Sequence, residues 1–202
     1  MFKISIIIPT INEANNLPLL LSDLSNIQKE GEIIIVDCGS NDKTNDIANI
    51  YGAKVVISKE RNRGFQLDLG AKNSKGDWLI FLHADTRLTH DWFRKINLFL
   101  KGNKNSIYYF KFKINNKKII YRVLEILVNF RSKYLKQPYG DQGLIIHRTT
   151  YFKNNGFRKI PLMEDVDFLR RLSNKKNLKQ LNLPIFISSR KWERTNIFLQ
   201  AI

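Results

Sequence analysis

The chain has 202 residues, 43% of them hydrophobic and 26% charged, and this balance excludes an intrinsically disordered protein. Its length allows one domain with a buried core and is too short for two ordinary domains, so we expect residues 1–202 to form a single domain. Basic side chains outnumber acidic ones by 34 to 18, and the one cysteine, Cys38, excludes an internal disulfide framework and predicts a cytoplasmic protein.

The first half of the chain alternates short apolar runs with helical patterns. Strands are predicted at 3–8, 32–36, 54–58 and 78–82, and helices at 17–27, 43–51 and 64–73. Strands that are continuously apolar and separated by helices indicate a mainly parallel sheet with helices on both faces. The fold class is therefore α/β.

The second half is less regular. The pattern predicts helices at 91–100, 119–136 and 164–174, an alternating and antiparallel strand at 106–114, and short strands at 144–147, 178–181 and 185–188.

Acidic side chains follow three of the predicted strands. Glu13 comes after the first strand, Asp37 and Asp42 end the second, and Asp85 follows the fourth. Ligands of such sheets bind beyond the carboxyl ends of the strands, so these residues predict one polar rim. Local roles are an alternative for each: Asn12, Asn15 or Asp42 capping a helix, and Asp85 forming a turn.

The positive charge is confined to the second half. Residues 1–100 carry 12 basic and 12 acidic side chains, whereas residues 101–202 carry 22 basic and 6 acidic ones and so hold the whole net charge of +16. Two plain explanations of this uneven charge are a solvated lysine-rich surface and a compositional bias. A surface that faces nucleic acid, anionic lipid or a phosphate-bearing substrate explains it equally well.

Four segments in order resemble the family 2 glycosyltransferases, the inverting nucleotide-sugar transferases with a GT-A fold. Residues 4–13 look like the opening strand and nucleotide loop, 32–44 like the second strand and its acidic turn, 81–86 like the metal-binding DxD segment, and 162–165 like the acidic catalytic motif. A short bacterial subgroup is more similar still, sharing His-Ala-Asp-Thr at 83–86 and the segments 138–143, 161–165 and 190–194. The resemblance covers residues 3–195.

The resemblance implies a GT-A sheet with a smaller acceptor-side region. Residues 1–100 would bind the nucleotide-sugar, specifically a UDP-sugar, and the metal, and residues 101–202 would bind the acceptor and hold the base. A carboxylate suits the N–H of a base or a ribose hydroxyl, and the resemblance gives these roles to Asp37 and Glu13. The other residues expected at the nucleotide are Pro9, Thr10, Asn12, Gly39, Ser40, Arg63 and Ala84. Arg61 and Arg63 are expected to approach the diphosphate or to be solvated.

Asp85 is the predicted ligand of a divalent cation, manganese or magnesium, that bridges the two phosphates. The sequence departs from the DxD pattern here, because His83 stands where the first acid usually lies. Imidazole suits manganese better than magnesium. His83 is either a second ligand or an uncoordinated neighbour.

Asp165 is the predicted general base that takes the proton of the acceptor hydroxyl in an inverting displacement. The alternative is that Glu164, Asp165 and Asp167 only stabilise a helix N-terminus. The remaining residues expected near the acceptor or the diphosphate are Glu164, Gly140, Asp141, Gln142, Arg190 and Trp192. A tight turn at 140–143 and core packing of Trp192 are the alternatives there.

The helix predicted at 119–136 mixes apolar and basic residues in a pattern typical of a helix on an anionic membrane surface, or of one packed on the sheet. No apolar run approaches the length of a membrane span, and the N-terminal run is too short for a signal peptide, so we expect at most a peripheral protein at the inner face of the membrane. Two other functions remain open: nucleotide-sugar binding without transfer, and nucleic-acid binding. The basic half shows no nucleic-acid-binding motif, so the latter is disfavoured.

Overall fold

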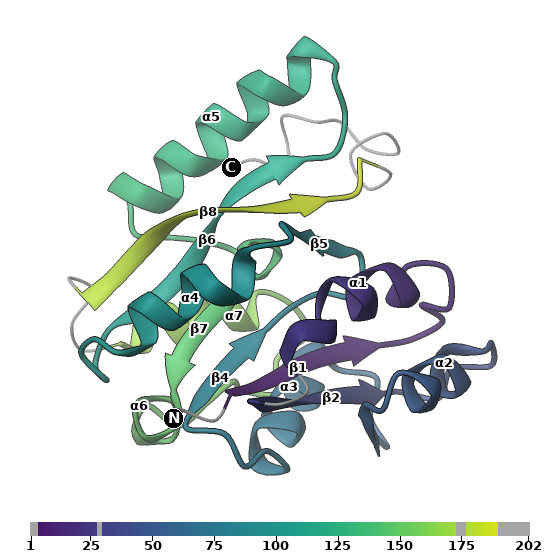
Figure 1. Cartoon of the computed structure of the whole chain (residues 1–202). Coiled ribbons are helices and arrows are strands. Elements are labelled where there is room, and N and C mark those ends of the chain that lie inside the picture. Colours follow the sequence, from purple (N-terminus) through teal and green to yellow (C-terminus); the bar gives the residue numbers. More distant parts are fainter. Residues whose placement is uncertain (1–3, 28–29, 173–176, 190–202) are drawn as a thin grey trace.

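The structure is a computed structural model that describes residues 4–27, 30–172 and 177–189 (Figure 1). The strands are β1 Ile4–Thr10, β2 Gly31–Asp37, β3 Lys54–Ile57, β4 Trp78–Phe81, β5 Thr86–Leu88, β6 Ile107–Ile114, β7 Leu144–His147 and β8 Leu178–Ile187. The helices are α1 Leu17–Asp23, α2 Thr44–Ile50, α3 Arg63–Lys72, α4 Trp92–Leu100, α5 Ile119–Tyr134, α6 Arg148–Lys153 and α7 Glu164–Arg171, with short 3₁₀ turns η1 Ser25–Ile27 and η2 Gly140–Gln142.

The described strands form one eight-stranded sheet in the order β3-β2-β1-β4-β7-β6-β8-β5. Strands β3, β2, β1 and β4 pair in parallel with one another in that order, and β6 pairs in parallel with β8. Strand β7 joins the two parts of the sheet by pairing antiparallel with both β4 and β6. The sheet is therefore mixed and mostly parallel, as the sequence predicts.

Both faces of the sheet are covered because successive strand residues point to opposite sides. In β1, Ile4, Ile6 and Ile8 pack into one hydrophobic cluster, which also contains the buried residues of α1, α2, α4 and α5. Ile7 belongs to a second cluster on the other face, with the buried residues of α3, α6 and α7. The continuous apolar runs read from the sequence thus reflect burial on both sides.

Two expectations about the second half need correction. Residues 178–188 were expected to form two short strands, but they form the single strand β8. Asn182 and Pro184 favour a turn, and the register shift opposite Tyr109 and Lys111 of β6 accommodates them without ending the strand. The strand at 106–114 is antiparallel only toward β7. The short elements β5 and α6 were not predicted.

Among the described residues, none of the helices combines the length and the apolar character needed to cross a membrane. The parallel pairing of β2, β1 and β4 brings their carboxyl ends, and the segments that follow them, to one edge of the sheet.

Candidate active site

The loops after β1 and β2 are joined by hydrogen bonds. The Asn12 amide donates to Ser40 Oγ (2.8 Å), the Asn41 amide donates to Asn12 Oδ1 (2.9 Å), and the Glu13 amide donates to Thr44 Oγ1 (2.8 Å). Asn12 has a left-handed backbone with φ of 54°, a conformation that asparagine tolerates. These bonds fix the two loops against each other, so Asn12 links the loops and does not cap α1, which begins after Asn16.

Asp37 organises the turn at the end of β2. Its carboxylate is fully buried and accepts hydrogen bonds from the Gly39 and Ser40 amides (3.0 and 2.9 Å), and from the side chains of Ser40, Thr10 (3.1 Å) and Asn45 (3.2 Å). Burial alone raises the pKa of this carboxyl, but the hydrogen bonds from Ser40, Asn45 and Thr10 outweigh it and hold the pKa below its ordinary value of 3.8. In this conformation Asp37 shapes the turn, and its contact with a nucleotide base stays a prediction.

Replacing Asp37 by asparagine is expected to lower the free energy of unfolding by about 2–3 kcal/mol near neutral pH, because the amide turns a buried acceptor into a donor that faces other donors. A carboxyl whose pKa is lowered by folding stabilises the fold above its unfolded pKa, and this contribution is lost as the pH falls through the folded value. Denaturant titrations should therefore show the difference from wild type shrinking below the ordinary pKa of 3.8. Asp46→Asn, which removes an exposed acid of α2, is the matched control. A constant difference at all pH values would contradict this role.

Glu13 and Asp85 lie close enough to influence each other. Burial raises the pKa of Glu13 most, the hydrogen bond from Asn16 Nδ2 to Glu13 Oε2 (2.8 Å) opposes that rise, and the charges of Asp85 and Asp42 add to it. Asp85 stands in the turn between β4 and β5 and also lines a groove with Asn16, Leu19 and Arg87. The predicted polar rim is thus a concentration of negative charge at one edge of the sheet.

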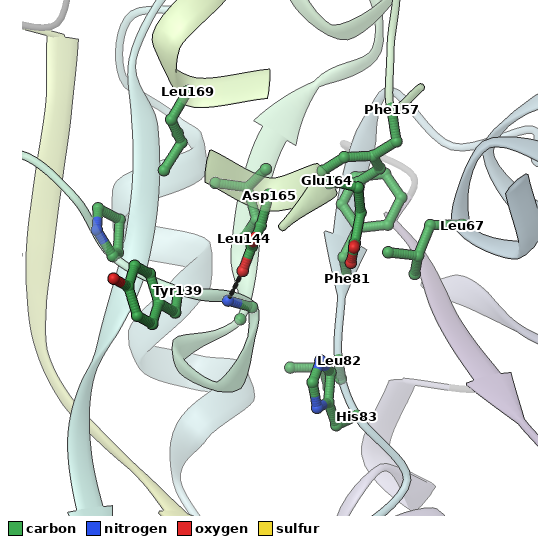
Figure 2. Close-up of a pocket in the computed structure, with 13 residues that line it drawn as sticks. Leu67, Phe81, Leu82, His83, Tyr139, Leu144, Phe157, Glu164, Asp165 and Leu169 are labelled. Carbon is green, nitrogen blue, oxygen red and sulfur yellow. Dashed lines mark hydrogen bonds between the residues drawn. The ribbon is translucent and has the colours of Figure 1, made fainter. Parts of the chain in front are cut away.

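The segments around residues 83, 140 and 165 converge at a pocket (Figure 2). The Gly140 amide donates a hydrogen bond to Asp165 Oδ2. A β-carbon at Gly140 would lie 3.1 Å from both Asp165 Oδ2 and His83 Nε2, so these two atoms are separated by no more than twice that distance. Figure 2 shows Asp165 and Glu164 extending from one turn of α7 into the pocket that His83 lines.

Gly140→Ala is expected to move both Asp165 and His83, because a methyl group would lie 3.1 Å from each. If these two side chains act in catalysis, kcat falls by about 10- to 100-fold, since small displacements of reacting groups are costly. The measurement is steady-state turnover with the donor identified by the screen described below. Gly102→Ala is the control, because its β-carbon meets Phe99 O at 3.0 Å and Tyr108 Oη at 3.3 Å, far along the chain from these segments. Equal activity in the two variants would contradict the importance of this close approach.

Two arginines approach Asp165. Arg63, at the first turn of α3, forms an ion pair with the buried Glu164, and this partner raises the pKa of Arg63 although burial lowers it. Arg131, on the buried side of α5, stacks its guanidinium 3.6 Å from the centre of the Tyr139 ring, and burial lowers the pKa of Arg131. Both arginines feel the charges of Asp165 and Asp141.

Several expectations now have a place in the structure. Arg63 contacts Glu164, so it links the two halves of the chain at the pocket. Arg61 lies near the turn of Asp37, where its charge opposes the burial that raises the pKa of Cys38. Asp42 also serves the local role that was considered, because its carboxylate accepts from the Thr44 amide (3.0 Å) at the start of α2. Pro9 and Thr10 end β1, and Ala84 is buried beside His83.

The segment 140–143 forms the tight turn that was considered, and its place on the acceptor side stays a prediction. It is a 3₁₀ turn before β7, with Gly143 at a φ of 61°, and it also supplies the amide that binds Asp165. Gln142 is buried and accepts from Ser132 Oγ (2.5 Å), so it holds the turn, and its place near the acceptor stays a prediction. Arg190 and Trp192 lie outside the described residues.

Sequence reasoning missed three residues of this region. Gln66 of α3 donates from Nε2 to the carbonyls of Thr10 (3.1 Å) and Val36 (2.7 Å), and so ties the ends of β1 and β2 together. Arg131 and Tyr139 form the stacked pair beside Asp165. For Arg131 a signal existed, because it shares a helical face with the buried Leu124 and Val128 at the spacing i, i+4, i+7.

The side chains at this edge of the sheet partly fit a site for a divalent cation. No group of three or more His, Cys, Asp or Glu side chains in the described part of the chain is arranged to hold a metal ion. Magnesium and manganese sites of nucleotide enzymes, however, use one or two protein ligands together with substrate phosphates. Asp85, whose charge raises the pKa of Glu13, would supply one such ligand, and His83 stands two residues before it.

A model of the family described as Glycosyl transferase family 2 matches residues 5–165. The chain belongs to glycosyl transferase family 2. The match spans the loops after β1, β2 and β4, the turn at Gly140, and the acids Glu164 and Asp165.

Curated family 2 relatives match the chain over part of its length. The 4,4'-diaponeurosporenoate glycosyltransferase of Staphylococcus haemolyticus is 40% identical over 96 residues, which are 44% of this chain and 26% of that protein. A PGL/p-HBAD biosynthesis glycosyltransferase of Mycobacterium bovis is 40% identical over 92 residues, which are 42% of this chain and 36% of that protein. The matched segments therefore span about a quarter of the first relative and about a third of the second.

Solved structures share the fold. Residues 1–349 of S. aureus TarS superpose with a TM-score of 0.74 at 19% identity, covering 98% of this chain and 63% of that one. Glucosyl-3-phosphoglycerate synthase of Mycobacterium tuberculosis, solved with Mn²⁺, UDP and glucosyl-3-phosphoglycerate, superposes with a TM-score of 0.68 at 18% identity, covering 91% of this chain and 70% of that one. These similarities confirm the predicted GT-A-type α/β fold.

Proposed function

We propose that this chain transfers a sugar from a nucleotide-diphosphate donor, specifically a UDP-sugar, to an acceptor hydroxyl with inversion at the anomeric carbon. The observation that carries the proposal is the convergence of His83 and Asp165 on Gly140, beside loops that can receive a nucleotide. Family membership supports it, as do the TarS complex with UDP-GlcNAc and the synthase complex with UDP and Mn²⁺, two proteins with the same fold.

In this proposal the first half of the chain holds the donor. Asp37 keeps the turn 37–40 in shape, and the backbone of that turn and of Pro9 and Thr10 meets the nucleoside, with Glu13 accepting from the ribose. Asp85, with or without His83, holds the divalent cation. When bound there, the cation neutralises the charge that develops on the diphosphate leaving group.

Asp165 is the proposed base. Its Oδ2 is held by the Gly140 amide, which leaves the carboxylate directed into the pocket that His83 also lines. An oriented carboxylate can take the proton of an acceptor hydroxyl as the sugar is transferred. Arg63 and Arg131 balance its negative charge from two sides, and Arg63 keeps Glu164 paired so that Asp165 alone acts as base.

We also assign the chain to the short subgroup with His-Ala-Asp-Thr at 83–86, and we place it in the cytoplasm at the inner face of the membrane. The sequence of this segment and the single cysteine support these assignments.

The test is a screen of nucleotide-diphosphate sugars with manganese, with and without a chelator. One donor, with uracil as its base, should raise the melting temperature in a manganese-dependent way, since a ligand stabilises the fold by RT ln(1 + [L]/Kd). The same donor should release UDP slowly even when water is the acceptor. If a donor stabilises the protein but is never cleaved, the chain binds nucleotide-sugars without transferring them. If no donor has an effect and the protein binds nucleic acid with a steep dependence on salt, the chain is a nucleic-acid-binding protein.

A further inference from the structure

Helix α5 has two apolar faces. Tyr121, Leu124 and Val128 pack into the core. A second stripe faces solvent, with side chains between 45% and 83% exposed at helical spacing: Ile119, Val123, Ile126, Leu127, Phe130 and Tyr134. Figure 1 shows α5 along the outer side of β6 and β8, at the end of the molecule away from α2. Scattered exposed apolar side chains are normal, but a continuous stripe marks an interaction surface.

Basic side chains surround this stripe. Residues 111–136 contain eight basic side chains and one acid, Glu125. Glu125 is buried, pairs with Arg122 (2.9 Å) and accepts from the Ile114 amide (2.7 Å), so its charge is compensated. The basic side chains that are exposed or half-buried around the stripe are Lys111, Lys113, Lys117, Lys118, Arg122, Lys133 and Lys136.

The grooves beside α5 are also lined by basic side chains. Lys111 and Lys133 line both a groove along α5 and a second one over β6 and β8, and Lys136 and Lys179 line the second. The partner that covers the stripe must therefore be apolar at its centre and negative around it. A bilayer with anionic headgroups has this composition over an area of any size.

We propose that α5 docks the protein on an anionic lipid surface, with the stripe inserted at the level of the headgroups and the surrounding lysines on lipid phosphates. The helix has 16 residues and carries charges along its length, so it lies in the surface and does not cross the bilayer.

Docking would place the proposed base at a fixed height above the lipid. The Tyr109 hydroxyl donates to the Ser132 carbonyl of α5 (2.9 Å), Ser132 Oγ donates to Gln142, and Arg131 stacks on Tyr139. These contacts join α5 to the turn whose Gly140 amide binds Asp165. This step rests on the proposed function, and it assigns the acceptor to a class: a hydroxyl carried on a membrane-anchored molecule.

The binding test uses the full chain and large vesicles, without donor or acceptor. Co-sedimentation is expected with equimolar phosphatidylcholine and phosphatidylglycerol at low salt, is expected to weaken at high salt, and is not expected with phosphatidylcholine alone. Because no sugar is present, this result is independent of glycosyl transfer. Failure of the donor screen with intact vesicle binding would remove the assigned acceptor class and leave the docking surface.

Two sets of variants locate the surface. The double variant Ile126→Gln with Phe130→Gln is expected to lower the vesicle–water partition coefficient by about 100-fold. The triple variant with serine at Lys117, Lys118 and Lys133 is expected to lower it by a similar factor, about fivefold for each charge removed. The controls make the same changes elsewhere: Ile50→Gln with Ile57→Gln, and serine at Lys43, Lys59 and Lys75, all exposed positions of the first half. The controls are expected to bind vesicles like wild type.

Three results would overturn the proposal: no binding to anionic vesicles at low salt, equal losses in the variants and their controls, or a dimer in solution that Ile126→Gln dissociates, which would give the stripe to a second copy of the chain. Thermal denaturation of each variant confirms that it is folded, and all of the replaced side chains are exposed in the structure.

Discussion

Replacing Asp165 by asparagine is expected to lower kcat by about 100- to 10,000-fold, the usual contribution of a positioned general base. The amide is nearly the same size, and its oxygen can still accept from the Gly140 amide. The bond from the Val166 amide to Oδ1 (2.8 Å) is lost, which is expected to lower the free energy of unfolding by about 1–3 kcal/mol while the fold and the donor affinity are retained. The measurement is kcat with the donor found by the screen, together with the donor-induced shift in melting temperature.

Asp167→Asn is the matched control for Asp165→Asn. It removes the same charge from the same first turn of α7, and its cost is limited to the partly exposed ion pairs with Arg171 (2.9 Å) and Arg158 (3.7 Å), each worth about 1 kcal/mol or less. Its activity should stay within about twofold of wild type on the same grounds. If both variants lost activity equally, Asp165 would act only by stabilising the helix N-terminus, the alternative that the sequence left open.

Asp85→Asn is expected to remove the manganese dependence of donor binding and to lower kcat/KM by about 100- to 1,000-fold, because the cation stabilises the leaving diphosphate by several kcal/mol. With manganese present, UDP should raise the melting temperature of this variant no more than it raises that of the wild type with a chelator. This thermal measurement does not depend on turnover.

Asp77→Asn is the control at the opposite end of the same strand, since Asp77 precedes β4 and Asp85 follows it. Both substitutions remove one negative charge, but only Asp85 lies near Glu13. His83→Gln then distinguishes the two roles considered for the imidazole. If the variant needs more manganese for donor binding, His83 is a metal ligand. If only kcat falls, His83 is an uncoordinated neighbour of the metal. Retained manganese dependence in Asp85→Asn would place the cation elsewhere.

The sequence was sufficient to predict the part of the fold that depends on local patterns. The runs of isoleucine in β1 and β2 are apolar on both faces, so their burial and their parallel pairing follow from composition. The polar loops after these strands then fall at one edge by topology alone. For this reason Glu13, Asp37 and Asp85 could be assigned to one site without coordinates.

What escaped prediction depends on contacts between distant segments. Asn182 and Pro184 look like a break, and only the partner strand β6 shows that β8 continues through them. The burial of Asp37 by five donors and the pairing of Arg63 with Glu164 depend on side-chain geometry that spacing does not contain. The approach of His83 to Asp165 requires β4 to pair with β7 and α7 to pack beside them, a long-range arrangement.

The position of β4 in the sheet bears on how the protein is made. Its four residues, Trp78–Phe81, are buried, and its free side is covered only by β7, which comes more than sixty residues later in the chain. While the ribosome is still adding the second half, β4 is an open, flat and apolar edge of the kind on which chains aggregate. Residues 1–100 are therefore synthesised long before β7 can cover β4, and expressing them alone is expected to yield insoluble material.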